Sequence, residues 1–125
     1  MNEPNQASDY TDTRGKTTIA AEVLLTIARL TTLDVPGVSR MCAVPGGVNR
    51  FFQRGVGEGV RIQIKEDNVV FADLYVILKN DVNIRDVSRE IQQAVARSIS
   101  DMVGMQVGRV NVHVEDIDYP AEDEA

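Results

Sequence analysis

The sequence predicts an α/β domain of the two-layer α+β type, with one mixed four-stranded sheet and two helices packed on one face. The chain has 125 residues, the usual length of one domain. Helix-like and strand-like apolar spacings follow one another in the order α-β-β-β-α-β. Each helix carries one apolar stripe, so both can cover the same sheet face. The third strand, second helix and last strand form a βαβ unit, which predicts a parallel last strand and a right-handed crossover.

The first helix is expected over residues 18–31, with Thr17 or Thr18 as its cap, because a hydroxyl accepts a hydrogen bond from a free N–H of the first turn. Residues 34–37 (DVPG) end this helix and turn the chain. Its apolar residues recur at spacings of four, four and three, which predicts that one stripe is buried. The members of that stripe are Ile19, Val23, Ile27 and Leu30.

Three strands are expected next, over residues 38–44, 60–65 and 69–79. A glycine-rich loop, residues 45–59, separates the first two, and a hairpin turn at 66–68 joins the second to the third. One face of the third strand is wholly apolar and consists of Val70, Ala72, Leu74, Val76 and Leu78. The other face is mixed and consists of Phe71, Asp73, Tyr75, Ile77 and Lys79.

The second helix is expected to begin after Asn83, a favoured capping residue, and to end before Gly104, which suits a left-handed terminal position. Its apolar stripe consists of Ile84, Val87, Ile91, Val95, Ile99 and Met102. In the last strand three valines, at 110, 112 and 114, alternate with polar residues.

The charge of the chain is concentrated at its two ends. The net charge is −6, but residues 1–13 and 115–125 together carry −9, and residues 14–114 carry +3. The predicted organisation is a flexible tail over 1–16, a single domain over 17–118 and an acidic flexible tail over 119–125. The acidic character therefore belongs to the tails, and the folded part is mildly basic.

A cytoplasmic location is expected. The N-terminus is polar and acidic, unlike a secretory signal, and the longest apolar runs are only a few residues, too short to span a membrane. Cys42 is the one cysteine, so no internal disulfide can form.

No catalytic, cofactor or metal site is expected, and we predict that the protein is not an enzyme. Residues 15–17 (GKT) resemble the end of a phosphate-binding loop, but Tyr10 stands where the motif needs its first glycine. The glycines of residues 55–59 lead into a strand and not into a helix N-terminus. A metal site needs several ligands, whereas His113 is the one histidine and Cys42 the one cysteine.

Two features are candidates for partner binding. The first is a loop in which two phenylalanines lie between two arginines: Arg50, Phe51, Phe52 and Arg54. Arginine beside aromatic residues suits protein interfaces, but also nucleic acid or an anionic membrane surface. In the alternative structural interpretation one phenylalanine closes over the core and the arginines are solvated. The second candidate is the mixed face of the third strand, with Phe71, Tyr75 and Ile77, beside which His113 is expected to lie.

Several segments taken together resemble the bacterial alkaline shock protein family, also called the Gls family of envelope stress response proteins. They are residues 15–23 (GKTTIAAEV), 35–38 (VPGV), 46–47 (GG), 73–78 (DLYVIL), 87–95 with Ile91-Gln92, and 110–117 (VNVHVEDI). The resemblance covers about residues 15–118, nearly all of the expected domain. The sequence departs from the family at Asn80, where members often carry a Tyr-Gly pair, and in the Arg-Phe loop at 50–54.

The resemblance implies a small cytoplasmic bacterial protein without enzymatic activity or cofactor. It also implies a protein partner, such as a membrane-anchored family member that holds the protein near the membrane, and self-association into a homo-oligomer. Our leading hypothesis is a binding or scaffold protein of envelope stress or homeostasis. Two alternatives stay open: a small RNA-binding module that uses the Arg-Phe loop, and a regulatory subunit of a lipid-metabolism enzyme that docks through Tyr75 and Ile77.

Overall fold

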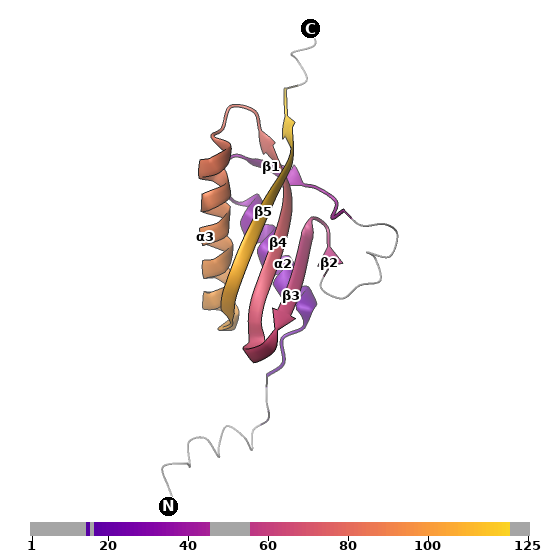
Figure 1. The fold of residues 1–125 in the computed structure, drawn as a ribbon, viewed down its shortest axis with the longest axis vertical. Coiled ribbons are helices and arrows are strands. Elements are labelled where there is room, and N and C mark those ends of the chain that lie inside the picture. Colours follow the sequence, from indigo (N-terminus) through magenta and orange to yellow (C-terminus); the bar gives the residue numbers. More distant parts are fainter. Residues whose placement is uncertain (1–14, 16, 46–55, 121–125) are drawn as a thin grey trace, which may run out of the picture.

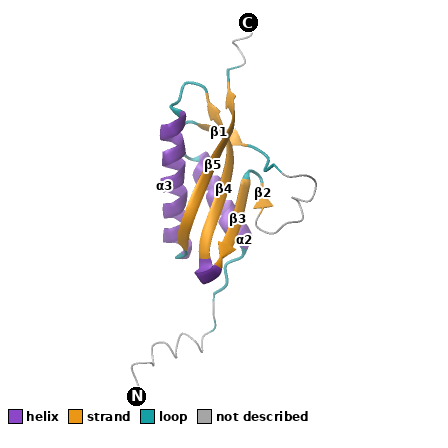
Figure 2. Cartoon of the chain, viewed as in Figure 1, coloured by secondary structure: helices purple, strands orange, loops and turns teal. Residues whose placement is uncertain are grey.

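The structure is a computed structural model that describes residues 15, 17–45 and 56–120. A sheet forms one layer and two helices form the other (Figures 1 and 2). The observed order of the main elements is the expected α-β-β-β-α-β, with one additional two-residue strand. The predicted tails over 1–16 and 119–125 lie mostly outside the described residues.

The central strand of the sheet is β4, which the sequence predicted with its correct bounds. Strand β5 runs parallel to β4 along one side. Strands β1 and β3 follow one another along the other side, both antiparallel to β4, and β2 pairs with β3. The parallel β4–β5 pair confirms the predicted parallel last strand. The strands are β1 (Val38–Met41), β2 (Val56–Gly57), β3 (Val60–Lys65), β4 (Val69–Lys79) and β5 (Gln106–Asp118).

The core lies between the helices and the even-numbered face of β4. That face, residues 70 to 78, was predicted correctly, and its side chains are at most 1% exposed. Helix α3 (Ile84–Val103) packs against it with Val87, Ile91, Val95 and Ile99. Aliphatic side chains fill this space almost alone, as expected of a chain without tryptophan.

The ends of α3 are fixed by the two residues that the sequence indicated. The side chain of Asn83 accepts a hydrogen bond from the backbone N–H of Asp86 at 3.0 Å. Gly104 has a φ of 74°, the left-handed conformation that ends helices. The outermost members of the predicted stripe, Ile84 and Met102, lie on the terminal turns of the helix and are 47% and 68% exposed.

The first helix differs from its prediction in start, cap and buried face. Helix α2 runs from Ala21 to Leu33, its N-cap is Ala20, and no side chain caps it, so the expected roles of Thr17 and Thr18 were wrong. Of the predicted stripe only Ile27 is buried, whereas Val23 and Leu30 are 44% and 54% exposed. The buried residues are Leu24, Ile27, Ala28 and Thr32.

A buried threonine explains part of that error. The Thr32 hydroxyl donates to the backbone carbonyl of Ala28 at 2.7 Å, so a polar side chain can occupy a fully buried position. Apolar residues occur on several sides of this helix, and only its packing against α3, β1 and β3 selects the face that is covered.

The first strands also differ from their predicted bounds. Strand β1 ends at Met41 and not at residue 44, and the expected loop over 45–59 contains β2 at its end. Within the described residues, the sheet thus contains the four expected strands and the additional two-residue β2. The turn at 66–68 is present, with positive φ angles at Asp67 and Asn68, as a tight connection requires.

Candidate functional site

The candidate site is the sheet face opposite the helices, which we call the open face. Side chains alternate between the two faces of a strand, so the odd-numbered residues of β4 lie on it. The registers place Arg61 and Asn111 on either side of Asp73, and Gln63 and Arg109 on either side of Phe71. No helix of the described ranges covers this face (Figure 2).

A hydrogen-bonded polar cluster occupies the middle of the open face. The Oδ1 atom of Asp73 accepts from the Nδ2 atom of Asn111 at 3.1 Å and lies 3.1 Å from the Nε2 atom of His113. The His113 ring stacks on the Tyr75 ring with centroids 4.4 Å apart and planes 10° from parallel. Asp73 and His113 are therefore each held by two neighbours, and the four side chains form one connected cluster on the sheet surface.

The cluster favours the ionised form of Asp73. Partial burial raises the pKa of this carboxyl, but the hydrogen bonds from His113 and Asn111 lower it, and so do the charges of His113 and Arg61. The result is a pKa below the ordinary value of 3.8. Asp73 is thus an anchored negative charge on a face that also carries arginine and lysine.

Basic and aromatic groups lie at one end of the open face. The Nζ atom of Lys65 lies 5.3 Å from the centroid of the Phe71 ring, a cation–π geometry. The edge of this ring is also close to β5 at Gly108, where a Cβ atom would lie 2.8 Å from the Phe71 Cε1 atom. A side chain at position 108 would therefore collide with the ring in its present position.

At the other end of the open face, the side chain of Asp118 links β5 to β1. The Asp118 carboxylate on β5 accepts a hydrogen bond from the Ser39 hydroxyl on β1. The Arg40 Nε atom lies 4.0 Å from the same carboxylate. Both groups of this ion pair are well exposed, so the pair contributes little stability.

The predicted binding residues fall into three groups. Phe71 is half-buried on the open face, as expected. Tyr75 and Ile77 are only 7% and 6% exposed, so they present much less apolar surface than the strand pattern indicated. The loop residues Arg50, Phe51, Phe52 and Arg54 lie outside the described residues.

The polar cluster itself was not predicted from the sequence. His113 lies on the open face, as predicted, but its contact with Asp73 and the contact of Asp73 with Asn111 were not foreseen. A signal was present, since Asp73 is the one acidic residue within an otherwise apolar strand segment, 69–78. The partners could not be assigned because they depend on the β4–β5 register, across some 40 residues of chain.

The functional groups of the cluster are suited to binding through hydrogen bonds. A carboxylate, an amide and an imidazole can accept and donate hydrogen bonds to a partner. Among the described residues, the hydrogen-bond partners of Asp73 are Asn111 and His113, and neither carries a hydroxyl or thiol. Cys42 is half-buried, and its backbone N–H donates to the Tyr75 carbonyl.

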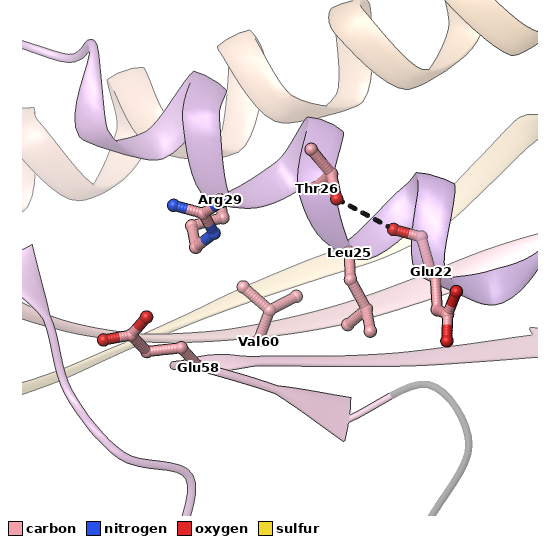
Figure 3. A pocket seen from close by; sticks show the side chains of 6 residues that line it. All are labelled: Glu22, Leu25, Thr26, Arg29, Glu58 and Val60. Carbon is pink, nitrogen blue, oxygen red and sulfur yellow. Dashed lines mark hydrogen bonds between the residues drawn. The ribbon is translucent and has the colours of Figure 1, made fainter.

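A small pocket lies between α2 and the turn that precedes β3 (Figure 3). Its volume is about 210 Å³, below the range of about 300–1,000 Å³ typical of small-molecule sites. Three charged residues line it, and the Thr26 hydroxyl is already bonded to the Glu22 carbonyl (Figure 3). The charged residues are Glu22, Arg29 and Glu58.

In the described part of the chain, no group of three or more histidine, cysteine, aspartate or glutamate residues is placed to hold a metal ion. No helix in those ranges combines the length and the apolar character needed to cross a membrane.

Solved structures with a similar chain path include variants of the MamM CTD. One aligns with a TM-score of 0.48 at 14% identity and covers 78% of this chain and 95% of that chain. A nickel form of another variant aligns with a TM-score of 0.48 at 13% identity and covers 78% of this chain and 99% of its own. Scores of this size do not establish a shared function.

Sequence comparisons identify closer relatives. The uncharacterized protein YqhY of Bacillus subtilis (strain 168) is 29% identical over 114 residues, which cover 89% of this chain and 84% of the relative. The uncharacterized protein Spy1535 of Streptococcus pyogenes serotype M6 is 35% identical over 103 residues, which cover 82% and 79%. A family model described as the alkaline shock protein 23 (ASP23) family, cell envelope-related function, matches residues 9–119. The chain therefore belongs to the alkaline shock protein family, as its sequence motifs indicated.

Proposed function

We propose that the protein is a non-enzymatic binding or scaffold protein of the cell envelope, which acts through contacts with other proteins. The observation that carries the proposal is the open face, where anchored polar and charged side chains lie on a rigid sheet without a covering helix in the described ranges. Preorganised side chains bind with a smaller loss of conformational entropy than flexible ones. The family's cell envelope-related function supports the cellular role.

The finer proposal concerns where the protein works. It acts in the cytoplasm during envelope stress or homeostasis and is held near the membrane by a membrane-anchored partner of the same family. The support for this step is the family resemblance of the sequence. The Arg-Phe loop, Arg50 to Arg54, follows β1 in the sequence and is the second proposed contact region.

RNA binding is the weaker candidate on the open face. Sequence-tolerant RNA binding needs aromatic rings on which bases can stack. Tyr75 is 7% exposed and already stacked on His113, and the edge of the Phe71 ring lies close to β5 at Gly108. Lys65 lies over the Phe71 ring as well. Both rings therefore have intramolecular partners, which favours a protein as the ligand.

Capture of partners by the tagged full-length protein from native lysate, with and without nuclease, tests the proposal. The open-face variant is Gln63→Glu with Lys65→Glu, and the matched control is Gln93→Glu with Arg97→Glu on the exposed side of α3, which changes the charge equally. A loop variant is Arg50→Glu with Arg54→Glu. We expect nuclease-resistant protein partners that the control retains and that the open-face or loop variant loses.

Two outcomes would contradict the proposal. If RNA is the main captured species and the protein partners disappear with nuclease, the RNA-binding alternative is correct. If all three variants capture the same partners as the unchanged protein, neither the open face nor the loop is the contact region. Circular dichroism of each variant confirms that the fold is retained.

A further inference from the structure

We infer that one end of the open face is a docking surface for an acidic peptide segment, and that its occupant is the chain's own N-terminal segment, residues 1–13. This end, which we call the basic end, carries Arg61, Lys65 and Arg109 around the Phe71 ring. Docking concerns the isolated chain and does not depend on the proposed function. Its consequence, that a partner of the open face must displace the segment, rests on that function.

Three cationic side chains are close together at the basic end. The strand registers set Arg61 beside Asp73 on β4 and Arg109 beside Phe71. Lys65 lies nearer the end of β3, with its Nζ atom 5.3 Å from the centroid of the Phe71 ring. Lys65 and Arg109 are exposed and Arg61 is half-buried, so a segment that lies on the sheet can contact all three.

The described residues leave the charge of the basic end largely uncompensated. Among them, no ion pair joins these three side chains to an acidic residue. Asp73 is the one acid that the registers place at the basic end, and its carboxylate already contacts Asn111 and His113. An acidic segment therefore complements this surface.

The N-terminal segment joins the domain at the same end of the sheet. Thr17 lines one pocket together with Ile64, the neighbour of Lys65, and Asn68, in the turn between β3 and β4. Figure 1 shows the chain passing this turn before it enters α2. An extended chain spans about 3.3–3.6 Å per residue, so Asp12 can lie about 17 Å from Thr17. This reach exceeds the thickness of a sheet, about 10 Å, so the segment can pass around the sheet end.

The charges of the segment and of the surface follow one another in complementary order. Away from the domain, the segment carries two bases and then two acids: Lys16, Arg14, Asp12 and Asp9. Inward from the sheet end, the surface carries two exposed acids and then two exposed bases: Glu66, Asp67, Lys65 and Arg109. A segment that runs inward from the turn therefore meets opposite charges at each step, and this order selects the N-terminal segment as the occupant.

The short tether makes a weak contact sufficient. Exposed ion pairs are individually weak. A short connection, however, holds the acidic residues at an effective concentration of about a millimolar beside their site. Because salt screens exposed charges, the docked state should be lost at high ionic strength.

Paramagnetic relaxation enhancement in the full chain tests the docking. A spin label is attached at Ser8→Cys in a Cys42→Ser background, so that the chain has one labelling site. We expect the amide resonances of Lys65, Phe71 and Arg109 to lose most of their intensity.

An internal reference separates docking from mere proximity. Val103 and Met105 line the same pocket as Thr17, with the buried side of the sheet behind them. A segment that stays near the sheet end without docking would broaden their resonances as much as those of the open face. We expect them to lose much less intensity, and this difference between the two sets of resonances is the measured quantity.

Charge reversal provides the matched variants. Lys65→Glu with Arg109→Glu should abolish the difference between the two sets. Arg85→Glu with Arg97→Glu, at exposed positions on α3, changes the net charge equally and should leave the difference intact. Salt at about 1 M, where the Debye length is about 3 Å, should abolish it in the unchanged sequence.

A charge exchange completes the test. Asp9→Lys with Asp12→Lys, added to the variant with reversed surface charges, should restore the difference, since opposite charges then meet again. Equal losses in the two sets of resonances would overturn the inference. So would a difference that reversal of the surface charges leaves unchanged. Either result leaves the proposed function standing, because capture from lysate measures partners and not the position of the segment.

Discussion

His113 and Asp73, 40 residues apart in the chain, lie 3.1 Å apart on adjacent strands of the sheet. His113 lies at the same time against the Tyr75 ring, which follows Asp73 on the same face of β4. The contact thus links the parallel β4–β5 pair through side chains as well as through the backbone. A surface that is organised in this way suits a protein that presents a fixed pattern of charge to a partner.

The Asp73 contact predicts a defined pH dependence of stability. Because the pKa of the folded state lies below the ordinary value of 3.8, ionised Asp73 stabilises the fold above that value, and the stabilisation is lost as the pH falls through the folded-state pKa. Asp73→Asn should therefore lower the free energy of unfolding by about 1 kcal/mol at neutral pH. Urea unfolding should show this difference undiminished above about pH 5 and shrinking below it.

Asn111→Ala is the companion variant for this measurement. It removes one of the hydrogen bonds that lower the pKa of Asp73 but keeps the charge of the carboxylate. We expect a smaller loss of stability than for Asp73→Asn, and a weaker dependence of the variant's stability on acidic pH, because the pKa of its Asp73 moves back toward the ordinary value. A difference between Asp73→Asn and the unchanged protein that stays constant from neutral to strongly acidic pH would show that the charge of Asp73 contributes nothing.

The two leucines of α2 provide a test of which helix face is buried. Leu24 is fully buried, whereas Leu30 on the same helix is 54% exposed. Leu24→Ala should lower the free energy of unfolding by about 2–5 kcal/mol, because it leaves a cavity in the core. Leu30→Ala should change it by about 0.5 kcal/mol or less, because surface substitutions rarely exceed that amount. Thermal or urea unfolding measures both, and equal effects would contradict the packing of α2.

Helix capping distinguishes the two helices in a similar way. Asn83→Ala removes the hydrogen bond to the Asp86 N–H and should lower the free energy of unfolding by about 1 kcal/mol. Thr18→Ala is the control, since α2 begins at Ala21 without a side-chain cap and Thr18 is exposed. We expect no measurable change for it in urea unfolding. If Thr18→Ala lowers the free energy of unfolding as much as Asn83→Ala does, Thr18 caps the first helix after all, as the sequence suggested.

The fold could be predicted where the sequence pattern permits one solution. Strand β4 alternates without interruption, and α3 has both a capping asparagine and a terminal glycine, so their bounds were correct. In α2, by contrast, Val23 and Leu24 are adjacent and equally apolar, and only contacts with distant elements decide which is buried. The Asp73 cluster was hidden for the same reason, because its partners depend on long-range strand pairing.

The contact between Gly108 and Phe71 gives the last prediction. A Cβ atom at position 108 would lie 2.8 Å from both the Phe71 Cε1 atom and the Val69 Cγ1 atom, closer than side chains tolerate. Gly108→Ala should therefore displace the ring and lower the free energy of unfolding by about 1–3 kcal/mol. Combined with Phe71→Leu, it should cost less than the sum of the two single changes, since the smaller side chain yields the space.

Gly104→Ala is the matched control for this cycle. Gly104 has a φ of 74° and no atom within 4 Å of an added Cβ, so its substitution costs about 1 kcal/mol through backbone strain alone. That cost should add to the cost of Phe71→Leu without any coupling, because the two residues share no contact. If Gly108→Ala is equally additive with Phe71→Leu in urea unfolding, the ring does not depend on the missing side chain. The open face would then accommodate an alanine at position 108 without displacement of the Phe71 ring.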